Sequence, residues 1–468
     1  MKRSDFFKNH KLPVWFLFAG GIALRYAYIL FTNIYTRQHD VGDFTSHTGG
    51  HYDYIDYIMN QGLLPDFDPS MVSQFAHPPL HHLLCAWWMK FMTGVLGVDF
   101  GTAAESLQYL TCLYSIGLMY VCYRIFLYLK LEGIPLYIAT AVVCFHPAFI
   151  LLSGSVNNDM LSVLLMAITL LFALKWYRDR RMRDLIVSAV TVGLAMMTKL
   201  SAVMVAAPIA FLMLVALIRC IREHKLKQII IQLGTYAAIS FPIGLWFPVY
   251  NAIRWDMPLF FVYPLSERIP QYLGDRSFLT RIFDFSPYQF QSVYEQWVTL
   301  EEPGLTPYSE FNPLIAALKN SMFGERINYY TFQEAPAMHI VTAALFISGA
   351  VLAFAAFIFM LHNLIKDRGE LHFERMAIGV FFIAMMLGYY SAAKQYPFEC
   401  TMDFRYIPLT VLCGACFLGL GAKRLLVPEP ERFRRVRRGG VILMGVTTAL
   451  FALLSSAMYV GLFSLTKK

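Results

Sequence analysis

Residues 338–363 read MHIVTAALFISGAVLAFAAFIFMLHN, and none of these 26 residues is Asp, Glu, Lys or Arg. A helix needs about 20 mostly apolar residues to cross the hydrocarbon core of a bilayer. A water-soluble helix of this length would instead carry a polar face for the solvent. The stretch therefore predicts a membrane-spanning helix.

Ten further apolar runs, some of them short, are distributed along the chain. They lie near residues 13–34, 104–128, 135–153, 158–175, 184–198, 200–219, 228–250, 374–392, 404–422 and 439–463. The composition agrees, because 57% of the 468 residues are hydrophobic and only 15% are charged, against roughly 25% charged in a soluble domain. We expect an all-α polytopic membrane protein with about eleven transmembrane helices, and not a cytosolic enzyme, a disordered chain or a disulfide scaffold.

The positions of the basic residues explain the net charge of +8. Of the 39 Lys and Arg residues, 25 fall in alternate connecting segments, beginning with a leader that contains Lys2, Arg3, Lys8 and Lys11. Cytoplasmic loops of membrane proteins carry such an excess. The pattern predicts a multi-pass protein with a cytoplasmic N-terminus and an uncleaved first span. The basic excess is a topology signal and does not indicate a nucleic-acid partner.

Two long segments interrupt the series of spans, and the alternation places both on the outer face. The first, 36–103, contains two expected interfacial helices at 51–61 and 79–92. The second, 251–337, is rich in Tyr, Phe and Pro, and its aromatic rings suit acceptor recognition. The expected organisation is a transmembrane module over 1–250, a large outer loop over 251–337 and C-terminal transmembrane helices over 338–468.

The densest polar sequence follows the first span directly. Residues 37–43 read RQHDVGD, residues 48–56 read TGGHYDYID, and residues 77–82 read HPPLHH. Carboxylates that are held beside a membrane and partly shielded from water can act as general bases. Asp40 and Asp43 are therefore candidate catalytic residues, and the alternative is a solvated loop of ordinary turn residues.

Two patterns in the first long segment could hold a divalent metal ion. Asp66 and Asp68 form a DxD string, whose carboxylates suit a hard cation such as Mn²⁺ or Mg²⁺. His77 and His81 are four residues apart and could bind Zn²⁺ from one helix face. The alternatives are a helix cap or turn at the DxD string and substrate contact by the histidines. No metal or other cofactor is assigned from these patterns.

Several motifs make the sequence similar to a known superfamily. They are the acidic residue Asp40 after the first span, the His-x-x-Tyr-Ile helix at 51–55, the Gly-x-Leu-Pro turn at 62–65 and the Pro-Pro-Leu helix start at 78–80. The likeness continues in Asn157-Asn158-Asp159, Thr198-Lys199 and Asp403-Phe404-Arg405-Tyr406. The chain resembles the GT-C superfamily of membrane glycosyltransferases, in the branch of dolichyl-phosphate-mannose protein mannosyltransferases and aminoarabinose lipid A transferases. Its strings look particularly like those of bacterial members, which implies a bacterial plasma membrane.

This resemblance implies an activity and its partners. Members transfer a sugar from a polyprenyl-phosphate-linked donor to an acceptor hydroxyl on the outer membrane face, with inversion. The acceptor here would be a protein, a glycolipid or a cell-wall glycan. By position, Asp40 would take the acceptor proton. The mannosyltransferases place two acidic residues side by side, whereas Val41 follows Asp40 here. Asp43 either supplies the second carboxylate or is a turn residue.

The resemblance also implies residues that bind the two substrates. Arg405, Lys199 and Arg37 are candidates for holding the donor phosphate, and Lys394 is a further option. Each could instead be a charge that extends to the interface. The candidates for other substrate contacts are His51, His77, His81, Asp159 and Tyr406. Asp159 either binds the sugar or caps a helix.

A transporter or flippase for a lipid-linked or polar solute is the alternative function. It predicts ionisable residues at mid-membrane on several spans. Arg25 lies in the middle of the first span, and its partner is expected to be a carboxylate, a backbone carbonyl or a lipid phosphate. A non-catalytic scaffold with the same fold is a third possibility.

Overall fold

The computed structural model describes residues 11–44, 48–269, 271–274, 276–294, 310–427 and 434–466. Lys2, Arg3 and Lys8 of the basic leader lie outside these ranges. Within them the chain forms α-helices and short 3-10 turns, and the one extended pairing is an isolated bridge between Tyr272 and Phe398. The expectation of an all-α polytopic membrane protein is confirmed.

Eight long apolar helices could each cross a membrane. They are α1 (Lys11–Phe31), α5 (Leu107–Tyr128, preceded by α4, Phe100–Glu105), α8 (Asp159–Asp179), α10 (Ala206–Arg222, preceded by the 3-10 turn Leu200–Val205), α11 (Leu226–Trp255), α14 (Ala337–Lys366), α15 (His372–Gln395) and α17 (Arg434–Thr466). The bent pair α6 (Gly133–Phe145) and α7 (Pro147–Leu151) makes a ninth if it counts as one span. In the described residues, length and composition thus give eight or nine candidate spans.

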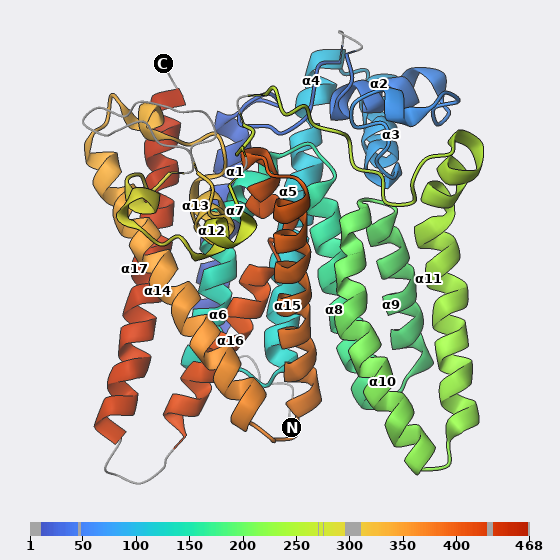
Figure 1. Ribbon diagram of the computed structural model, residues 1–468. Coiled ribbons are helices and arrows are strands. Elements are labelled where there is room, and N and C mark those ends of the chain that lie inside the picture. The colour runs from blue at the N-terminus through green and yellow to red at the C-terminus, as the bar shows by residue number, and fades with distance from the viewer. Residues whose placement is uncertain are drawn as a thin grey trace.

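Two of the expected spans are not among these eight or nine helices, so the number of about eleven stays a prediction. Helix α9 (Met182–Met196) has 15 residues and α16 (Thr410–Leu426) has 17. Both are shorter than the ~20 residues that a bilayer core requires. They pack inside the bundle, where α9 lies between α8 and α11, and α16 lies against α6 and α14. Figure 1 shows α8 to α11 standing beside the larger group formed by the other long helices.

The bend between α6 and α7 has a local cause. Pro147 has no N–H to donate, and its ring disfavours a helical conformation at the preceding residue. His146 is accordingly extended, and the two helices meet at 48°. The carbonyl of Cys144, next to the bend, accepts a hydrogen bond from Arg25 Nη1 at 2.7 Å.

The structure shows which groups satisfy Arg25, for which the sequence suggested a carboxylate, a backbone carbonyl or a lipid phosphate. The side chain is fully buried, and Nη1 also donates to the carbonyl of Gly21 at 2.9 Å. Its Nε donates to the Ser115 hydroxyl at 2.8 Å. Backbone carbonyls and a hydroxyl therefore satisfy this cation within the bundle, as a buried guanidinium requires.

One end of the bundle carries the helices of both long segments. Helices α2 (His51–Gln61), α3 (Leu80–Gly94), α12 (Phe278–Phe283) and α13 (Pro313–Phe323) lie toward the upper end in Figure 1. We call it the loop end. At the opposite end, Glu370 pairs with Lys130 at 2.5 Å and with Arg178, which joins two connections between helices to the last turn of α8. The two interfacial helices begin and end within two residues of the expected positions, and the division of the chain at 250 and 338 stays a prediction.

Helices α2 and α3 have a small apolar core of their own. Tyr52, Ile55, Cys85 and Met89 are fully buried in it, and Phe44 stacks on Tyr52 with ring centroids 4.6 Å apart. Phe44 therefore attaches the segment that follows α1 to this core. The residues immediately before Phe44 form one wall of the candidate site.

Candidate active site at the loop end

A tight turn after α1 presents Asp40. Asp40 and Gly42 both have positive φ angles, of 55° and 64°. A Cβ atom on Gly42 would lie 2.0 Å from the carbonyl oxygen of Gly49, so only glycine fits this close approach. The backbone carbonyl of Asp40 accepts a hydrogen bond from the His51 N–H at 3.1 Å, where α2 begins. The turn thus ties the backbone of Asp40 to the start of α2.

Gln38 fastens the same turn to the transmembrane bundle. Its side-chain amide donates to the carbonyl of Gly154 at 2.8 Å and accepts from the N–H of Val156 at 3.0 Å. Gly154 and Val156 belong to the connection that leads into α8. Asp40 and the start of α8, where Asp159 lies, are therefore held in a fixed relation.

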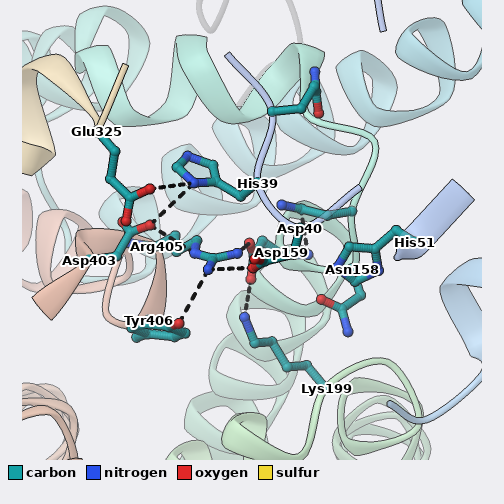
Figure 2. Close-up of polar contacts among 12 residues, drawn as sticks. His39, Asp40, His51, Asn158, Asp159, Lys199, Glu325, Asp403, Arg405 and Tyr406 are labelled. Carbon is teal, nitrogen blue, oxygen red and sulfur yellow. Dashed lines mark hydrogen bonds and ion pairs between the residues drawn. The ribbon is translucent and has the colours of Figure 1, made fainter. Parts of the chain in front are cut away.

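Arg405 lies at the centre of a group of carboxylates (Figure 2). Its Nη2 is 2.7 Å from Asp40 Oδ2, and its Nε is 2.8 Å from Asp403 Oδ2. Its Nη1 is 3.8 Å from Asp159 Oδ2. The Arg405 side chain is only 11% exposed, whereas that of Asp40 is 45% exposed. Asp40 is thus the member of this group that an incoming molecule can reach most easily.

Lys199 and Tyr406 extend the cluster on one side. Lys199 pairs with the buried Asp159, and its ammonium lies 4.9 Å from the centre of the Tyr406 ring. The Arg405 guanidinium lies 5.1 Å from the centre of the same ring and donates to the Tyr406 hydroxyl at 3.3 Å. An aromatic face attracts cations. Tyr406 therefore helps to hold two positive charges close together.

His39 and Glu325 extend the cluster on the other side. His39 Nδ1 lies 3.0 Å from Glu325 Oε2 and 3.7 Å from Asp403 Oδ2. Burial opposes the charged form of His39, but the neighbouring carboxylates prevail and raise its pKa. Burial, reinforced by the negative charge of Glu325, raises the pKa of Asp403 to about 6. The histidine thus compensates part of the carboxylate charge.

The same three residues could hold a cation. In the described ranges, His39, Glu325 and Asp403 form the group whose possible ligand atoms all lie within 4.8 Å of one another. However, Arg405 Nε contacts Asp403 at 2.8 Å, which would place a guanidinium beside a metal ion. Two positive charges this close repel each other. In this structure His39 pairs with Glu325, and Arg405 pairs with Asp403.

The charge balance of the cluster is negative. Its carboxylates are Asp40, Asp159, Glu325 and Asp403, and its basic residues are Arg405, Lys199 and His39. One negative charge remains in excess even when His39 is protonated. The guanidinium of Arg405 nevertheless lowers the pKa of Asp40 to about 2. Asp40 is therefore a carboxylate at neutral pH and can accept a proton.

A second polar group, the histidine cluster, consists of His51, His77, His81 and His82. His51 Nδ1 lies 2.9 Å from His82 Nε2, and the rings of His51 and His77 stack with centroids 5.6 Å apart. Burial lowers the pKa of His77 and of His81 to about 4. The rings are therefore neutral at pH 7, and they lie between α2, α3 and the turn that carries Asp40.

The comparisons with known proteins bear on this arrangement. Residues 76–246 match the family model of dolichyl-phosphate-mannose-protein mannosyltransferases. The chain thus resembles the GT-C glycosyltransferases. The matched residues include Asp159 and Lys199 and stop short of Asp40 and Arg405. No curated protein sequence matches the chain.

Solved structures give a more distant likeness. A crystal structure of ArnT from Cupriavidus metallidurans bound to undecaprenyl phosphate is 14% identical, with a TM-score of 0.49, over 96% of this chain and 77% of ArnT. The apo form of that protein gives a TM-score of 0.47. An oligosaccharyltransferase from Archaeoglobus fulgidus, in complex with Zn and sulfate, is also 14% identical, with a TM-score of 0.49 over 94% of this chain and 53% of its own. These scores are too low to carry an inference about the site.

The structure brings together most of the residues that the GT-C resemblance singled out. Asp40, Asp159, Lys199, Arg405 and Tyr406 lie in one cluster although four separate segments supply them. His51, His77 and His81 lie beside it in the histidine cluster. Sequence spacing alone did not indicate that the Arg405 cluster and the histidine cluster lie next to each other.

Other candidates have different positions. Asp43 accepts a hydrogen bond from the Tyr35 hydroxyl at 3.4 Å, and Arg37 lines a cavity that also reaches Asp40. Asp68 of the DxD string caps a 3-10 turn by accepting from the Ser70 N–H at 2.9 Å. In the described part of the chain, neither the DxD string nor the pair His77 and His81 belongs to a group of three possible metal ligands.

Sequence reasoning missed three members of the GT-C-like site. His39 and Asp403 are neighbours of Asp40 and Arg405 in the quoted motifs, and adjacency could have suggested them. Glu325 lies just after α13 in the 251–337 segment. That segment contains no motif with a known relative, so only the folded chain reveals Glu325.

Proposed function

We propose that the protein is an inverting glycosyltransferase that moves a sugar from a polyprenyl-phosphate-linked donor to an acceptor hydroxyl. The observation that carries this proposal is the accessible carboxylate of Asp40, which shares Arg405 with two buried carboxylates. The family match over residues 76–246 supports the reaction class. The distribution of basic residues supports a loop end on the outer face of a bacterial plasma membrane.

Asp40 acts as the general base. Its carboxylate takes the proton of the acceptor hydroxyl while the acceptor oxygen bonds to the anomeric carbon. The bond between that carbon and the phosphate oxygen breaks, and the phosphate leaves with the electron pair. Because the acceptor enters opposite the leaving group, the anomeric configuration inverts.

Arg405 and Lys199 stabilise the departing phosphate. Both cations lie over the face of Tyr406, and Asp159 fixes the ammonium of Lys199. A guanidinium and an ammonium can each donate hydrogen bonds to phosphate oxygens. Asp159 acts through these two cations and is therefore a positioning residue.

Donor binding also tunes the base. The pKa of Asp40 is about 2 because its carboxylate pairs with Arg405. Such a carboxylate is a weak base, and catalysis is more efficient when the pKa lies nearer the operating pH. A phosphate that shares the guanidinium weakens the pairing with Asp40 and raises its pKa. The base thus becomes stronger when the donor is in place.

The donor's hydrocarbon chain has a matching apolar cavity. The cavity has a volume of about 680 Å³ and lies mainly among α13, α14, α15 and α16. Phe404 and Ile407 line it, next in sequence to the Arg405-Tyr406 pair. A chain bound there would lead its phosphate toward Arg405. Burial of isoprenoid CH₂ groups supplies about 0.8 kcal/mol each.

Replacing Asp40 with Asn tests the proposal. The purified protein is incubated with labelled undecaprenyl-phosphate sugars and a bacterial envelope extract, and the transferred label is measured. Asp40→Asn should lower the transfer rate by about 10²–10⁴-fold, because the proton acceptor is lost. Binding of undecaprenyl phosphate should persist.

Asp99→Asn is the matched control, because Asp99 is an exposed carboxylate that caps α4 outside the Arg405 cluster and should retain transfer. Full activity of Asp40→Asn would refute the assignment of the base. Movement of the intact lipid across liposomes, with no transfer by the wild type, would instead support a transporter or flippase. The hydrogen bonds of Arg25 argue against that alternative. They occupy this mid-membrane guanidinium with protein groups, whereas a transporter would use such a cation to bind its solute.

A further inference from the structure

Two arginines meet on one tyrosine ring at the end of the bundle opposite the loop end. Tyr177 lies near the end of α8 and is buried. Arg180 follows α8, and Arg219 lies in the last turn of α10. Each guanidinium carbon is 5.2 Å from the centre of the Tyr177 ring. These helix ends are at the lower end of the group formed by α8 to α11 in Figure 1, and we call Arg180 and Arg219 the arginine pair.

Contacts with aromatic rings hold the arginine pair in place. The guanidinium carbon of Arg180 also lies 5.0 Å from the centre of the Trp176 ring, and that of Arg219 lies 4.8 Å from the centre of the Phe373 ring on α15. Aromatic faces attract cations. The rings are uncharged, however, so they gather two like charges without neutralising either one.

The nearby carboxylates have other partners. Among the described residues, no carboxylate forms an ion pair with either member of the arginine pair. The acidic residues whose charges act on the pair are Glu223 and Glu374. Glu223 pairs with Lys225 at 2.8 Å, and Glu374 accepts a hydrogen bond from the Tyr128 hydroxyl at 3.4 Å.

Positive charge is therefore in excess around the arginine pair. Glu370, the remaining carboxylate of this region, pairs with two other cations. The basic residues here are Lys130, Arg178, Arg180, Arg219 and Lys225, and the acidic ones are Glu223, Glu370 and Glu374. The basic residues outnumber the acidic ones even when every carboxylate is counted as ionised. An anion is thus attracted to this place.

Two hydrogen-bond donors beside this charge have no partner. Nη1 of Arg180 and the hydroxyl of Tyr177 are both buried, and neither contacts an acceptor in the described part of the chain. A buried donor that is left without an acceptor costs about 1–3 kcal/mol. Burial also lowers the pKa of Arg180, and the charge of Arg219 acts in the same direction. A negative group with several acceptor oxygens would relieve both costs.

We propose that Arg180 and Arg219 bind a phosphate group at the end of the bundle opposite the loop end. A phosphate presents several acceptor oxygens, and two guanidiniums can each donate hydrogen bonds to it. The headgroup of an anionic phospholipid and a soluble phosphate compound both carry this group. Ile218 and Ile221 are exposed on α10 beside Arg219, which provides apolar surface for acyl chains.

An anionic phospholipid is the expected source of the phosphate. Basic pockets between transmembrane helices on the cytoplasmic side bind anionic headgroups. The distribution of basic residues supports a cytoplasmic position for this end. The inference uses this proposed orientation and does not depend on glycosyl transfer.

Native mass spectrometry of the full-length protein in detergent tests the inference. The protein is titrated with phosphatidylglycerol, which is anionic, or with phosphatidylcholine, whose choline compensates the phosphate charge. Phosphatidylglycerol should bind to the wild type about 10-fold or more tightly. Arg219→Gln should weaken that binding by about 10-fold and leave phosphatidylcholine binding unchanged.

A second measurement separates the two sources of phosphate. Melting temperatures are compared in phosphatidylcholine nanodiscs with and without inorganic phosphate or glycerol 3-phosphate. A rise in the melting temperature of the wild type that is absent from Arg219→Gln would support the same site with a soluble ligand. Binding of phosphatidylglycerol that requires Arg219 would support the lipid.

Arg222→Gln is the charge-matched control. Arg222 is exposed in the same last turn of α10, and its replacement should leave phosphatidylglycerol binding unchanged. Melting curves show whether each variant is folded. If Arg219→Gln does not fold, the same comparison is made with Arg180→Gln.

Two results would overturn the inference. The first is equal binding of phosphatidylglycerol and phosphatidylcholine together with no effect of the soluble phosphates. The second is an equal loss of binding in Arg219→Gln and Arg222→Gln, which would mean diffuse attraction to a basic surface. Neither result involves sugar transfer, so a failure of the Asp40 test remains distinguishable.

Discussion

The Arg405 cluster and the histidine cluster lie side by side at the loop end, yet their side chains differ in charge. In the first, every acidic side chain lies close to a cation, and Asp40 stays ionised with a pKa of about 2. In the second, burial lowers the pKa of His77 and His81 to about 4, and the rings are neutral. The two groups are joined by the hydrogen bond from the His51 N–H to the carbonyl of Asp40.

This difference in charge separates two roles. The Arg405 cluster can carry out chemistry, and the histidine cluster supports its structure. Burying a charge is costly unless an opposite charge or hydrogen bonds compensate it. The Arg405 cluster meets this condition and keeps charged groups next to an accessible carboxylate. The histidine cluster avoids the cost by staying neutral, and its stacked rings support the turn that carries Asp40. We therefore expect changes in the first to affect activity most, and changes in the second to affect stability in acid.

Arg405→Gln should have the largest effect. It leaves Asp159 and Asp403 buried with less compensating charge, and breaking a buried ion pair costs about 3–5 kcal/mol. The melting temperature should therefore fall clearly. Sugar transfer should fall by about 100-fold or more, because the phosphate loses a cation that stabilises it as it leaves.

Arg405→Lys provides the matched control for this change. It keeps one positive charge but cannot contact Asp40 and Asp403 through a planar fork. Its stability and activity should lie between those of the wild type and Arg405→Gln. If Arg405→Gln melts like the wild type, the ion pairs of the cluster do not stabilise the fold, and the contrast with the histidine cluster is lost.

Acid should destabilise the histidine cluster by an intermediate amount. His81 is buried beside Cys85 and His82 and has a folded-state pKa of about 4, below its usual 6.5. Between these two pH values the unfolded chain binds a proton at this site and the folded chain does not. The free energy of unfolding therefore falls as the pH drops, by about 3 kcal/mol in total for this residue.

His81→Gln should reduce this acid sensitivity. Melting temperatures are measured from pH 8 to pH 4.5 for the wild type, for His81→Gln and for His224→Asn, which replaces an exposed histidine. We expect a shallower decline for His81→Gln and an unchanged decline for His224→Asn. Parallel curves for all three proteins would mean that His81 takes up its proton equally well in the folded state.

Chelation should have the smallest effect. His39, Glu325 and Asp403 are close enough to share a cation, but Arg405 already contacts Asp403. Transfer in excess EDTA should change by less than about twofold, whereas a bound metal that holds the site would be lost together with activity. Loss of transfer in EDTA, with recovery on adding Mn²⁺, Mg²⁺ or Zn²⁺, would instead make these three residues a metal site.

The sequence by itself determined the membrane architecture and most of the chemistry-bearing residues. Long apolar runs fold as helices in a bilayer, because every backbone polar group must find its partner within the segment. Ionisable residues are expensive in such a chain. The few that gather between spans, such as Asp40, Lys199 and Arg405, were therefore visible as candidates. The short helix α9 was predicted at nearly its observed bounds, whereas α16 begins six residues later than its apolar run suggested, because the 3-10 turn Phe404–Tyr406 precedes it.

Only the tertiary structure decided how these residues act together. Asp40 and Arg405 pair across 365 positions of sequence, and Glu325 joins them from a segment without a recognisable motif. The pKa of Asp40 depends on distances and burial that packing creates. Electrostatic interactions vary with separation and with exclusion of water, and neither quantity is encoded in local spacing. The sequence therefore indicated which ionisable residues form the site, and the fold determined their protonation and their ion-pair partners.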